Sequence, residues 1–429
     1  MTLRTKKEID KFMQAVSQKG MVMTLMPLRT LCKLLGNPQD DTAFVHIAGT
    51  NGKGSVLSMV SSCLEEAGYK TGRFFSPQVF EDEPALSVNG CVPNETIYTE
   101  IMSEIIEAYE IMQSQGLETP TAFELEALAA LMYFSKTHCD IAVVECGMGG
   151  RDDATNVITS NTVCVITPIG IDHTKFLGNS VAEIADNKSD IFTKNCIAVT
   201  AQQPTEVIDV LKKKAAAVGC ELVICKPAEN VFQNGLDNQS FDYLGEKYKI
   251  HLCGSHQSEN GAVAVQTLLA LRRKGFEISD ENIRNGLIKA SWHGRFECIS
   301  KNPLIIIDGA HNVAAAKVFA NSIDEYLRGK KIIFVFGILK DKQYREVARI
   351  TAPKADRIIT FTPPSERALD GRELAEICSH YASSEYAQSP EQAAGLALKT
   401  AEEMGYSDTA ICAFGSLYSL ESLRKIFLK

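Results

Sequence analysis

Short runs of apolar, mostly β-branched residues recur through the chain, and helical patterns separate them. The clearest runs are residues 43–48, 141–144, 163–166, 197–200, 304–307, 332–336, 357–361 and 409–414. Several are apolar almost throughout, which is typical of strands that are buried on both faces of a parallel sheet. The pattern therefore predicts an α/β fold in which helices cover parallel sheets.

The length of the chain predicts more than one hydrophobic core. The chain has 429 residues, whereas single cores stop growing at roughly 250–300 residues. A polar, turn-rich β segment at 230–250 interrupts the α/β pattern, and a second set of strands begins at residue 304. We predict two α/β domains, residues 1–297 and 298–429, the second one smaller.

Composition excludes several classes of protein. The hydrophobic fraction of 45% and the charged fraction of 23% are ordinary for a globular protein. A net charge of -9 argues against nucleic-acid binding, which depends on Lys and Arg neutralising phosphates. No signal-peptide core or uninterrupted apolar run of about 18 residues occurs, so we expect a cytoplasmic protein that does not bind membranes. The 13 cysteines lack zinc-site spacing and are interpreted as reduced thiols.

A glycine-rich segment at 48–55, AGTNGKGS, follows the first predicted strand and precedes a helical pattern. A turn of this kind is also typical of a tight strand–helix connection. Lys53 and Ser55 at the helix entry favour nucleotide binding, because backbone N–H groups at a helix start and a Lys side chain bind phosphates. The predicted ATP-binding residues here are Gly49, Thr50, Asn51, Gly52, Lys53, Gly54 and Ser55.

The AGTNGKGS segment resembles the signature of the folylpolyglutamate synthase/dihydrofolate synthase family, which is related to the Mur ligases. The preceding LCKLLGNP segment at 31–38 is also similar, and further matches recur in order along nearly the whole chain. The resemblance implies a P-loop-containing N-terminal ATPase domain with a parallel sheet, at 1–297. It also implies a Rossmann-like α/β C-terminal domain that binds the incoming amino acid, at 298–429.

Polar residues follow two of the predicted strands. Glu145 comes directly after one strand and His173 lies beyond the next, so adjacent parallel strands are expected to bring them to one rim of the sheet. A histidine in this position is otherwise more often a hydrogen-bonded loop residue. The resemblance implies that Ser76, Glu145 and His173 hold Mg²⁺.

The capping box of Ser180 and Glu183 predicts a helix start shortly before Lys188. Lys188 alone is typical of a surface lysine. The resemblance implies instead a catalytic lysine modified to a carbamate by carbon dioxide, although the neighbouring residues 187, 189 and 190 differ from the family pattern.

Five further residues match family motifs in the second half of the chain. The resemblance implies that Asn260 contacts adenine, that Asp308 holds the ribose, and that Ser416 contacts the amino-acid carboxylate. It also implies catalytic roles for Arg295 at the triphosphate and His311 near the phosphates. A guanidinium suits the role of Arg295 at the triphosphate because it binds phosphate oxygens with two parallel hydrogen bonds.

The resemblance implies a monomeric, ATP- and Mg²⁺-dependent ligase of folate biosynthesis and one-carbon metabolism. It would join dihydropteroate or a folyl-glutamate to L-glutamate through an acyl phosphate. Gln78 and Pro84 replace a His and an Arg of the family pattern, so a ligase for another carboxylic acid stays open. So does a non-catalytic nucleotide-binding paralogue, which the altered 187–190 segment favours and the retained Lys53 disfavours. A P-loop GTPase or a dehydrogenase is a further class, but its signatures are absent.

Overall fold

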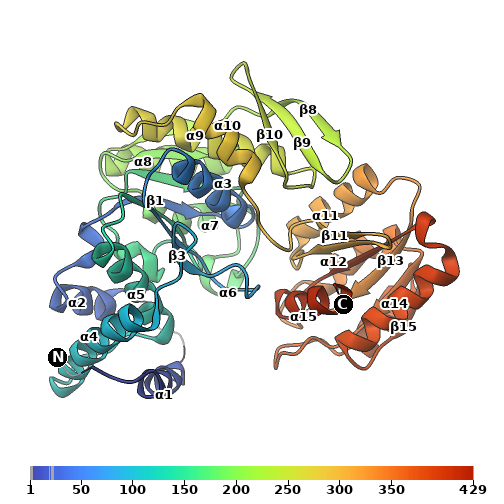
Figure 1. Cartoon of the computed structure of the whole chain (residues 1–429), viewed down its shortest axis with the longest axis horizontal. Helices are drawn as coiled ribbons and strands as arrows, with labels where there is room; N and C mark the ends of the chain where they lie inside the picture. Colours follow the sequence, from blue (N-terminus) through green and yellow to red (C-terminus); the bar gives the residue numbers. More distant parts are fainter. Residues whose placement is uncertain (1–2, 19, 21–23, 429) are drawn as a thin grey trace. The chain divides into compact units, whose positions relative to one another are not determined.

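The computed structural model describes residues 3–18, 20 and 24–428 (Figure 1). The chain forms two compact units, and each unit is built from several stretches of sequence. Unit 1 comprises Met1–Gln78, Pro84–Pro227 and Glu259–Lys289, and unit 2 comprises Val79–Glu83, Ala228–Ser258 and Ala290–Lys429. The predicted division into functional domains at 297/298 stays a prediction.

The described part of unit 1 contains a seven-stranded sheet in the order β3-β2-β4-β1-β5-β6-β7. Neighbouring strands are parallel except β3, which runs antiparallel to β2. The strands are β1 (Ala43–Ala48), β2 (Thr71–Phe74), β3 (Leu86–Val88), β4 (Ile141–Glu145), β5 (Val163–Ile166), β6 (Ile197–Thr200) and β7 (Glu221–Ile224). The prediction that β4 and β5 are neighbours is wrong, because β1 lies between them; their carboxyl ends still face one rim of the sheet.

Helices cover both faces of this sheet (Figure 1). The described helices up to the end of unit 1 are α1 (Lys6–Ser17), α2 (Met26–Leu34), α3 (Lys53–Glu66), α4 (Glu95–Ser114), α5 (Ala122–Lys136), α6 (Thr174–Leu177), α7 (Val181–Lys188), α8 (Thr205–Val218), α9 (Gln257–Arg273) and α10 (Asp280–Lys289). Short 3₁₀ turns are η1 (Pro38–Asp40), η2 (Ala154–Val157) and η3 (Ser189–Ile191). The capping boxes at Thr121 and Ser180 begin α5 and α7, as predicted.

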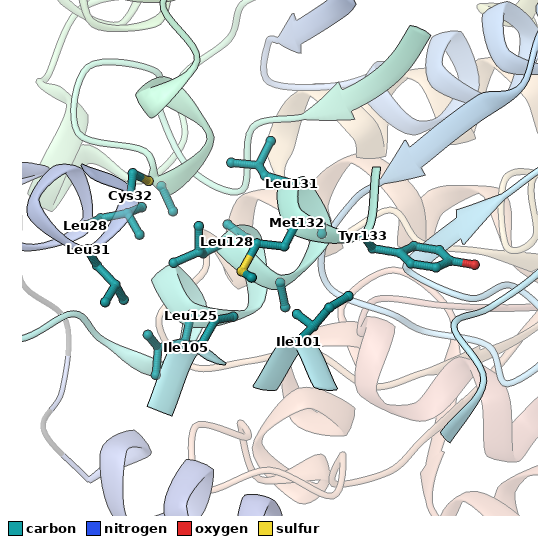
Figure 2. Close-up of a cluster of buried hydrophobic side chains, with 14 of the residues drawn as sticks. Leu28, Leu31, Cys32, Ile101, Ile105, Leu125, Leu128, Leu131, Met132 and Tyr133 are labelled. Carbon is teal, nitrogen blue, oxygen red and sulfur yellow. The ribbon is translucent and has the colours of Figure 1, made fainter. Parts of the chain in front are cut away.

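Apolar side chains explain why these elements pack where they do. Even-numbered residues of β1 and β4 point to one face, where Phe44 and Val144 pack against α2, α4 and α5. Figure 2 shows part of this cluster, in which Leu28, Ile105 and Leu128 come from the three helices. A second cluster on the same face joins β5 and β6 to α7 and α8. Helix α3 lies against β1, β2 and β4.

The described part of unit 2 contains a three-stranded antiparallel sheet, β10-β9-β8, and a six-stranded sheet, β11-β12-β16-β13-β14-β15. The smaller sheet confirms the predicted β segment at 230–250; its strands are β8 (Glu229–Asn234), β9 (Asn238–Tyr243) and β10 (Glu246–Ile250). The larger sheet is parallel except for β11. Its strands are β11 (Glu297–Lys301), β12 (Leu304–Asp308), β13 (Lys331–Phe336), β14 (Arg357–Thr360), β15 (Ser383–Tyr386) and β16 (Thr409–Phe414).

The six-stranded sheet is buried on both faces, as the apolar runs predict. Ile306 and Phe334 point toward the helices α11 (Val313–Tyr326), α12 (Tyr344–Thr351) and α13 (Gly371–Ser379). Ile305 and Val335 point toward α14 (Pro390–Met404) and α15 (Leu417–Phe427) on the opposite face. The remaining 3₁₀ turns are η4 (Ala352–Lys354) and η5 (Tyr406–Asp408). The structure therefore confirms an α/β fold with parallel sheets covered by helices.

Helices in the described residues were searched for a possible membrane span. None of them combines the length and the apolar composition that crossing a bilayer requires.

Candidate active site

The glycine-rich loop connects the end of β1 to the start of α3. Gly49 has φ 152° and Gly52 has φ 88°, a backbone region that side chains rarely adopt. A Cβ atom at Gly52 would lie 2.5 Å from Oδ1 of Asn260 on α9, so the glycine allows this close approach. Helix α3 begins at Lys53 without a side-chain cap, and its first N–H groups are those of Lys53, Gly54 and Ser55.

Part of the loop is held by the chain that follows β5. The N–H groups of Thr50 and Asn51 donate to the carbonyl oxygen of Pro168, at 3.0 and 3.3 Å. The hydroxyl of Thr50 donates to the carbonyl oxygen of Gly170, at 3.0 Å. Thr50 and Asn51 therefore fix the shape of the loop through their N–H groups and the Thr50 hydroxyl.

A lysine and a carboxylate meet beside the loop. The register of β1 and β4 sets Glu145 opposite Ile47, and Nζ of Lys53 lies 3.4 Å from Oε1 of Glu145. A Cβ atom at Gly147 would lie 3.0 Å from Oγ of Ser76. Ser76 therefore lies close to the loop that leaves Glu145, as the predicted magnesium site requires.

Lys188 lies under the same loop. Its side chain is 5% exposed, and Nζ donates to the carbonyl oxygen of Gly49 at 2.8 Å. Burial, followed by the positive charge of Lys53, lowers the pKa of Lys188 to about 8. The loop after β4 packs on the end of α7, where Cβ atoms at Gly149 and Gly150 would lie 2.5 Å from Asn187 and 2.6 Å from Lys188. Lys188 is therefore a buried residue of the site and not a surface lysine.

His173 lies on the loop after β5, at the start of α6. Its backbone is left-handed, with φ 50°, and its N–H donates to Oδ1 of Asp172 at 2.8 Å. Its side chain is 45% exposed. Among the described residues, no group of three or more His, Cys, Asp and Glu side chains is arranged to hold a metal ion. The predicted magnesium set contains only two residues of these types, so the assignment of Ser76, Glu145 and His173 stays a prediction.

Sequence reasoning missed a buried polar network behind Glu145. His46 on β1 is fully buried, and burial lowers its pKa to about 3, which keeps the ring neutral. Nδ2 of Asn161 donates to Nδ1 of His46 at 3.4 Å, and Nε2 of His46 lies 2.7 Å from Oγ1 of Thr155. The Thr155 hydroxyl donates to Asp153 at 2.5 Å, and Asp153 also accepts the N–H of Met148 at 2.7 Å. The network fixes the loop that leaves Glu145.

Unit 2 carries the other predicted residues. Asp308, at the end of β12, accepts the N–H groups of Phe296 and Ala310, both at 2.7 Å. Burial raises the pKa of Asp308 to about 6, although the charge of Arg295 opposes this shift. Arg295 lies against Gly309, where a Cβ atom would meet its guanidinium. The structure therefore brings Arg295 and Asp308 together.

Two more predicted residues of unit 2 lie after strand ends. Nδ1 of His311 is 2.7 Å from the carbonyl oxygen of Gly309, so Nδ1 carries the proton that this bond requires. Ser416 follows β16, the parallel neighbour of β12. Its side chain is 1% exposed, and within the described residues its hydroxyl has no hydrogen-bond partner. A buried hydroxyl without a partner is costly, which is consistent with a hydroxyl that binds substrate.

Two family models match the chain. The Mur ligase middle domain matches residues 47–268, and the Mur ligase glutamate ligase domain matches residues 294–417. The first contains the glycine-rich loop, Glu145 and Lys188, and the second contains Arg295 and Asp308. The fold and the site thus define an ATP-dependent ligase of the Mur ligase superfamily.

Similar proteins specify the family further. The chain is 30% identical over 407 residues to a dihydrofolate synthase/folylpolyglutamate synthase of Bacillus subtilis, covering 93% of each chain. It is 34% identical over 344 residues to a probable dihydrofolate synthetase of Schizosaccharomyces pombe, covering 78% of this chain and 81% of the relative. A solved structure of Mycobacterium tuberculosis folylpolyglutamate synthase with ADP and AMPPCP superposes with a TM-score of 0.88 at 28% identity, covering 99% of both chains. The chain belongs to the folylpolyglutamate synthase/dihydrofolate synthase family, which confirms the predicted family and enzyme class.

Proposed function

We propose that this ligase joins L-glutamate to the carboxylate of dihydropteroate or a folyl-glutamate, and that it uses Mg-ATP. The observation that carries the proposal is the convergence of Lys53, Glu145 and Lys188 on the glycine-rich loop. Nζ of Lys53 is 3.4 Å from Glu145, and Nζ of Lys188 is 2.8 Å from the Gly49 oxygen. The similarity of the chain to enzymes named for folate substrates extends over nearly its whole length.

The chemistry begins with the acid. A carboxylate does not form an amide spontaneously, so its oxygen first attacks the γ-phosphorus of ATP to give an acyl phosphate and ADP. In unit 1, Lys53 stabilises the negative charge of the transferring phosphoryl group, and the helix entry at Gly54 binds phosphate oxygens. The amino group of glutamate then attacks the acyl carbon, phosphate leaves, and the nitrogen loses a proton.

The residues around Glu145 suit a magnesium ion. Mg²⁺ prefers carboxylate and hydroxyl oxygens and keeps several water molecules. The Ser76 hydroxyl lies beside Gly147 on the loop that leaves Glu145, and the Glu145 carboxylate lies beside Lys53 of the glycine-rich loop. His173 follows β5 at the same rim of the sheet. These residues would hold Mg²⁺, which would neutralise charge on the triphosphate.

Lys188 supports the predicted carbamate. A neutral amine is needed to add carbon dioxide, and a pKa of about 8 provides a useful neutral fraction near neutral pH. The amine attacks carbon dioxide and loses a proton, which leaves a carbamate anion. Asp190 does not replace this anion, because its carboxylate pairs with Arg151 and Lys214. We propose that Lys188 carries this carbamate although residues 187, 189 and 190 differ from the family pattern, and that the carbamate orients the substrate.

The acyl substrate depends on a segment that differs from the family pattern. Gln78 replaces a His of the family pattern, and its Oε1 accepts the N–H of Ala85 at 3.3 Å. Ala85 directly follows Pro84, the second replacement. This hydrogen bond closes a loop from Val79 to Glu83. We propose that the acid site accepts a pterin-bearing carboxylate despite the two replacements.

The test measures ADP release with purified protein, Mg-ATP, L-glutamate and either dihydropteroate or a reduced folate. Omitting glutamate, the acid or Mg²⁺ should each abolish ADP release, and mass spectrometry should show an amide product one glutamate heavier than the acid. Turnover with another carboxylic acid but with no pterin would contradict the proposed substrate. No acid-dependent turnover with any member of a panel of acids would contradict the ligase reaction and favour a non-catalytic paralogue.

A further inference from the structure

Three cysteines meet on one face of the unit 1 sheet, away from the glycine-rich loop. Cys196 and Cys220 directly precede β6 and β7 at matching positions of the parallel register. Cys164 lies on β5 opposite Ala198 of β6. Side chains alternate between the faces of a sheet, so this register directs all three thiols to the same face. The apolar cluster under α8 contains Cys164 and Cys196, and Cys220 packs against it.

Cys196 is the centre of this group, which we call the thiol cluster. The thiol of Cys220 and the N–H of Thr193 donate hydrogen bonds to its sulfur. These donors hold the pKa of Cys196 well below its usual range. The hydrogen bond to Cys196 raises the pKa of Cys220, and burial raises the pKa of Cys164. Cys196 is therefore the thiol of the cluster that loses its proton most readily.

The exposure of the three side chains differs. Cys164 is fully buried, Cys196 is 2% exposed and Cys220 is only half-buried. None is in a disulfide. Since no metal-binding group of three or more His, Cys, Asp and Glu side chains occurs in the described chain, the thiol cluster is not arranged as a metal site. A thiolate is the form of cysteine that reacts with oxidants, and Cys220 gives it a neighbour near the surface.

We propose that the thiol cluster is an oxidation-sensitive site at which a hydroperoxide joins Cys196 and Cys220 in a reversible disulfide. The Cys196 thiolate attacks the outer oxygen of the hydroperoxide, breaks the O–O bond and becomes a sulfenic acid, while the alkoxide that leaves takes a proton. The sulfur of Cys220 then attacks the Cys196 sulfur, the S–O bond breaks, and the oxygen leaves as water with the Cys220 proton. Two thiols and one hydroperoxide give one disulfide, one alcohol and one water. The proposal does not depend on the ligase substrate.

The position of Cys164 defines its role. Its Sγ donates to the carbonyl oxygen of Ile191 at 3.1 Å, and Nδ2 of Asn161 donates to the same oxygen at 2.9 Å. Ile191 follows Lys188 by three residues. Because the single thiol proton of Cys164 is donated to Ile191 and Cys164 is the most buried of the three, Cys220 is the partner that we assign to Cys196. Cys164 packs beside Cys196 in the apolar cluster and closes its buried side.

The experiment treats the reduced full-length protein with hydrogen peroxide, alkylates the remaining thiols and maps the peptides by mass spectrometry. Tryptic peptides 195–212 and 215–247 should appear joined, with two hydrogen atoms lost, and a thiol reductant should separate them. Fragmentation distinguishes Cys220 from the buried Cys225 in the same peptide. Oxidation of the pair should be roughly tenfold faster than that of the exposed Cys91, because the thiolate is the reactive form.

Five variants sharpen the result. Cys220→Ser should remove the joined peptides, and Cys220→Ala repeats the test if the first variant does not fold. Cys164→Ser keeps a hydroxyl donor and should still allow the disulfide, and Cys91→Ser is the matched control that should leave it unchanged. In unoxidised protein at mildly acidic pH, ultraviolet thiolate absorbance should be present and should disappear in Cys196→Ser. Oxidation of Cys91 while Cys196 and Cys220 remain open to alkylation would overturn the proposal.

Discussion

Two amines lie on either side of one short loop, and their charges affect each other. Lys53 contacts Glu145, and its charge contributes to the lowered pKa of Lys188. The two amines lie in one charged environment, but each has a different expected role. Substitutions at Lys53 and Lys188 should therefore have different effects.

Lys53→Ala should lower turnover about 100- to 1,000-fold, because it removes a charge that faces the transferring phosphoryl group. The measurement is steady-state ADP formation, with the melting temperature as a check of folding. Lys33→Ala, at an exposed position of α2, is the control and should keep full activity. Turnover within threefold of the unchanged enzyme would remove Lys53 from the phosphate site.

Lys188→Met should change how stability depends on pH. The folded pKa of about 8 lies below the ordinary 10.5, so the unfolded chain binds the proton more tightly between these values. The free energy of unfolding therefore rises as pH increases from about 8 to 10.5, by about 3 kcal/mol in total. Urea unfolding at several pH values in carbon dioxide-free buffer should show this rise in the native protein but not in Lys188→Met.

Lys194→Met, at an exposed position, is the control for this pH dependence and should retain the rise. An identical pH dependence in Lys188→Met would show that Lys188 titrates as an ordinary surface lysine.

Motif residues of the site were predictable from sequence because the glycine-rich loop and the strand ends carry recognisable patterns. The supporting residues were not. His46 lies within an apolar strand, and nothing in its local sequence indicates Thr155 and Asn161 as partners. The thiol cluster likewise depends on a strand register that brings together cysteines far apart in the chain.

At the scale of elements, the start of α7 controls where Lys188 lies. The hydroxyl of Ser180 accepts the N–H of Glu183 at 3.2 Å, and Glu183 accepts the N–H of Ser180 at 3.1 Å. Helix α1 begins with an equivalent box, formed by Thr5 and Glu8. The two helices provide a matched pair for separating stability from activity.

Ser180→Ala and Thr5→Ala should each cost about 1 kcal/mol of stability, since each removes a helix cap. Only Ser180→Ala should also lower turnover, because α7 ends at Lys188. Urea unfolding and steady-state kinetics on both variants make the comparison. Equal activity in the two variants would mean that the end of α7 is held by the packing of the 149–151 loop alone.

The apolar runs predicted the central strands, and the reason is burial on both faces. The strands that sequence reasoning missed are short or lie at sheet edges. β2 reads TGRF, and β15 reads SSEY with no large aliphatic residue. These segments are strands because their backbones pair with a neighbouring strand: β2 pairs with β4, and β15 pairs with β14.

At the scale of the molecule, the assignment of Val79–Glu83 to unit 2 could not be predicted, because its partners are distant in sequence. Phe80 is 2% exposed within the core that contains Leu420 and Leu423. The guanidinium of Arg424 lies 5.5 Å from the Phe80 ring centre and donates to Asp82 at 2.9 Å.

Phe80→Ala should cost about 3–5 kcal/mol, the usual effect of emptying a buried aromatic site. Hydrogen exchange should show faster exchange in α15 of unit 2, while β1 of unit 1 keeps its protection. Val92→Ala, at a side chain that is 56% exposed, is the control and should change neither region. Faster exchange confined to β1 would contradict the assignment of Phe80 to the core of unit 2.

The pairing of Asp82 with Arg424 has a consequence for biosynthesis. The two residues are separated by 342 positions, and ribosomes add roughly 5–20 residues per second. The apolar ring at Phe80 therefore leaves the ribosome roughly 20–70 s before its partners on α15 exist, a delay that follows from the same synthesis rate. During that interval the nascent chain leaves exposed an aromatic side chain that the finished enzyme buries, so Val79–Glu83 cannot reach its final packing until synthesis is nearly complete.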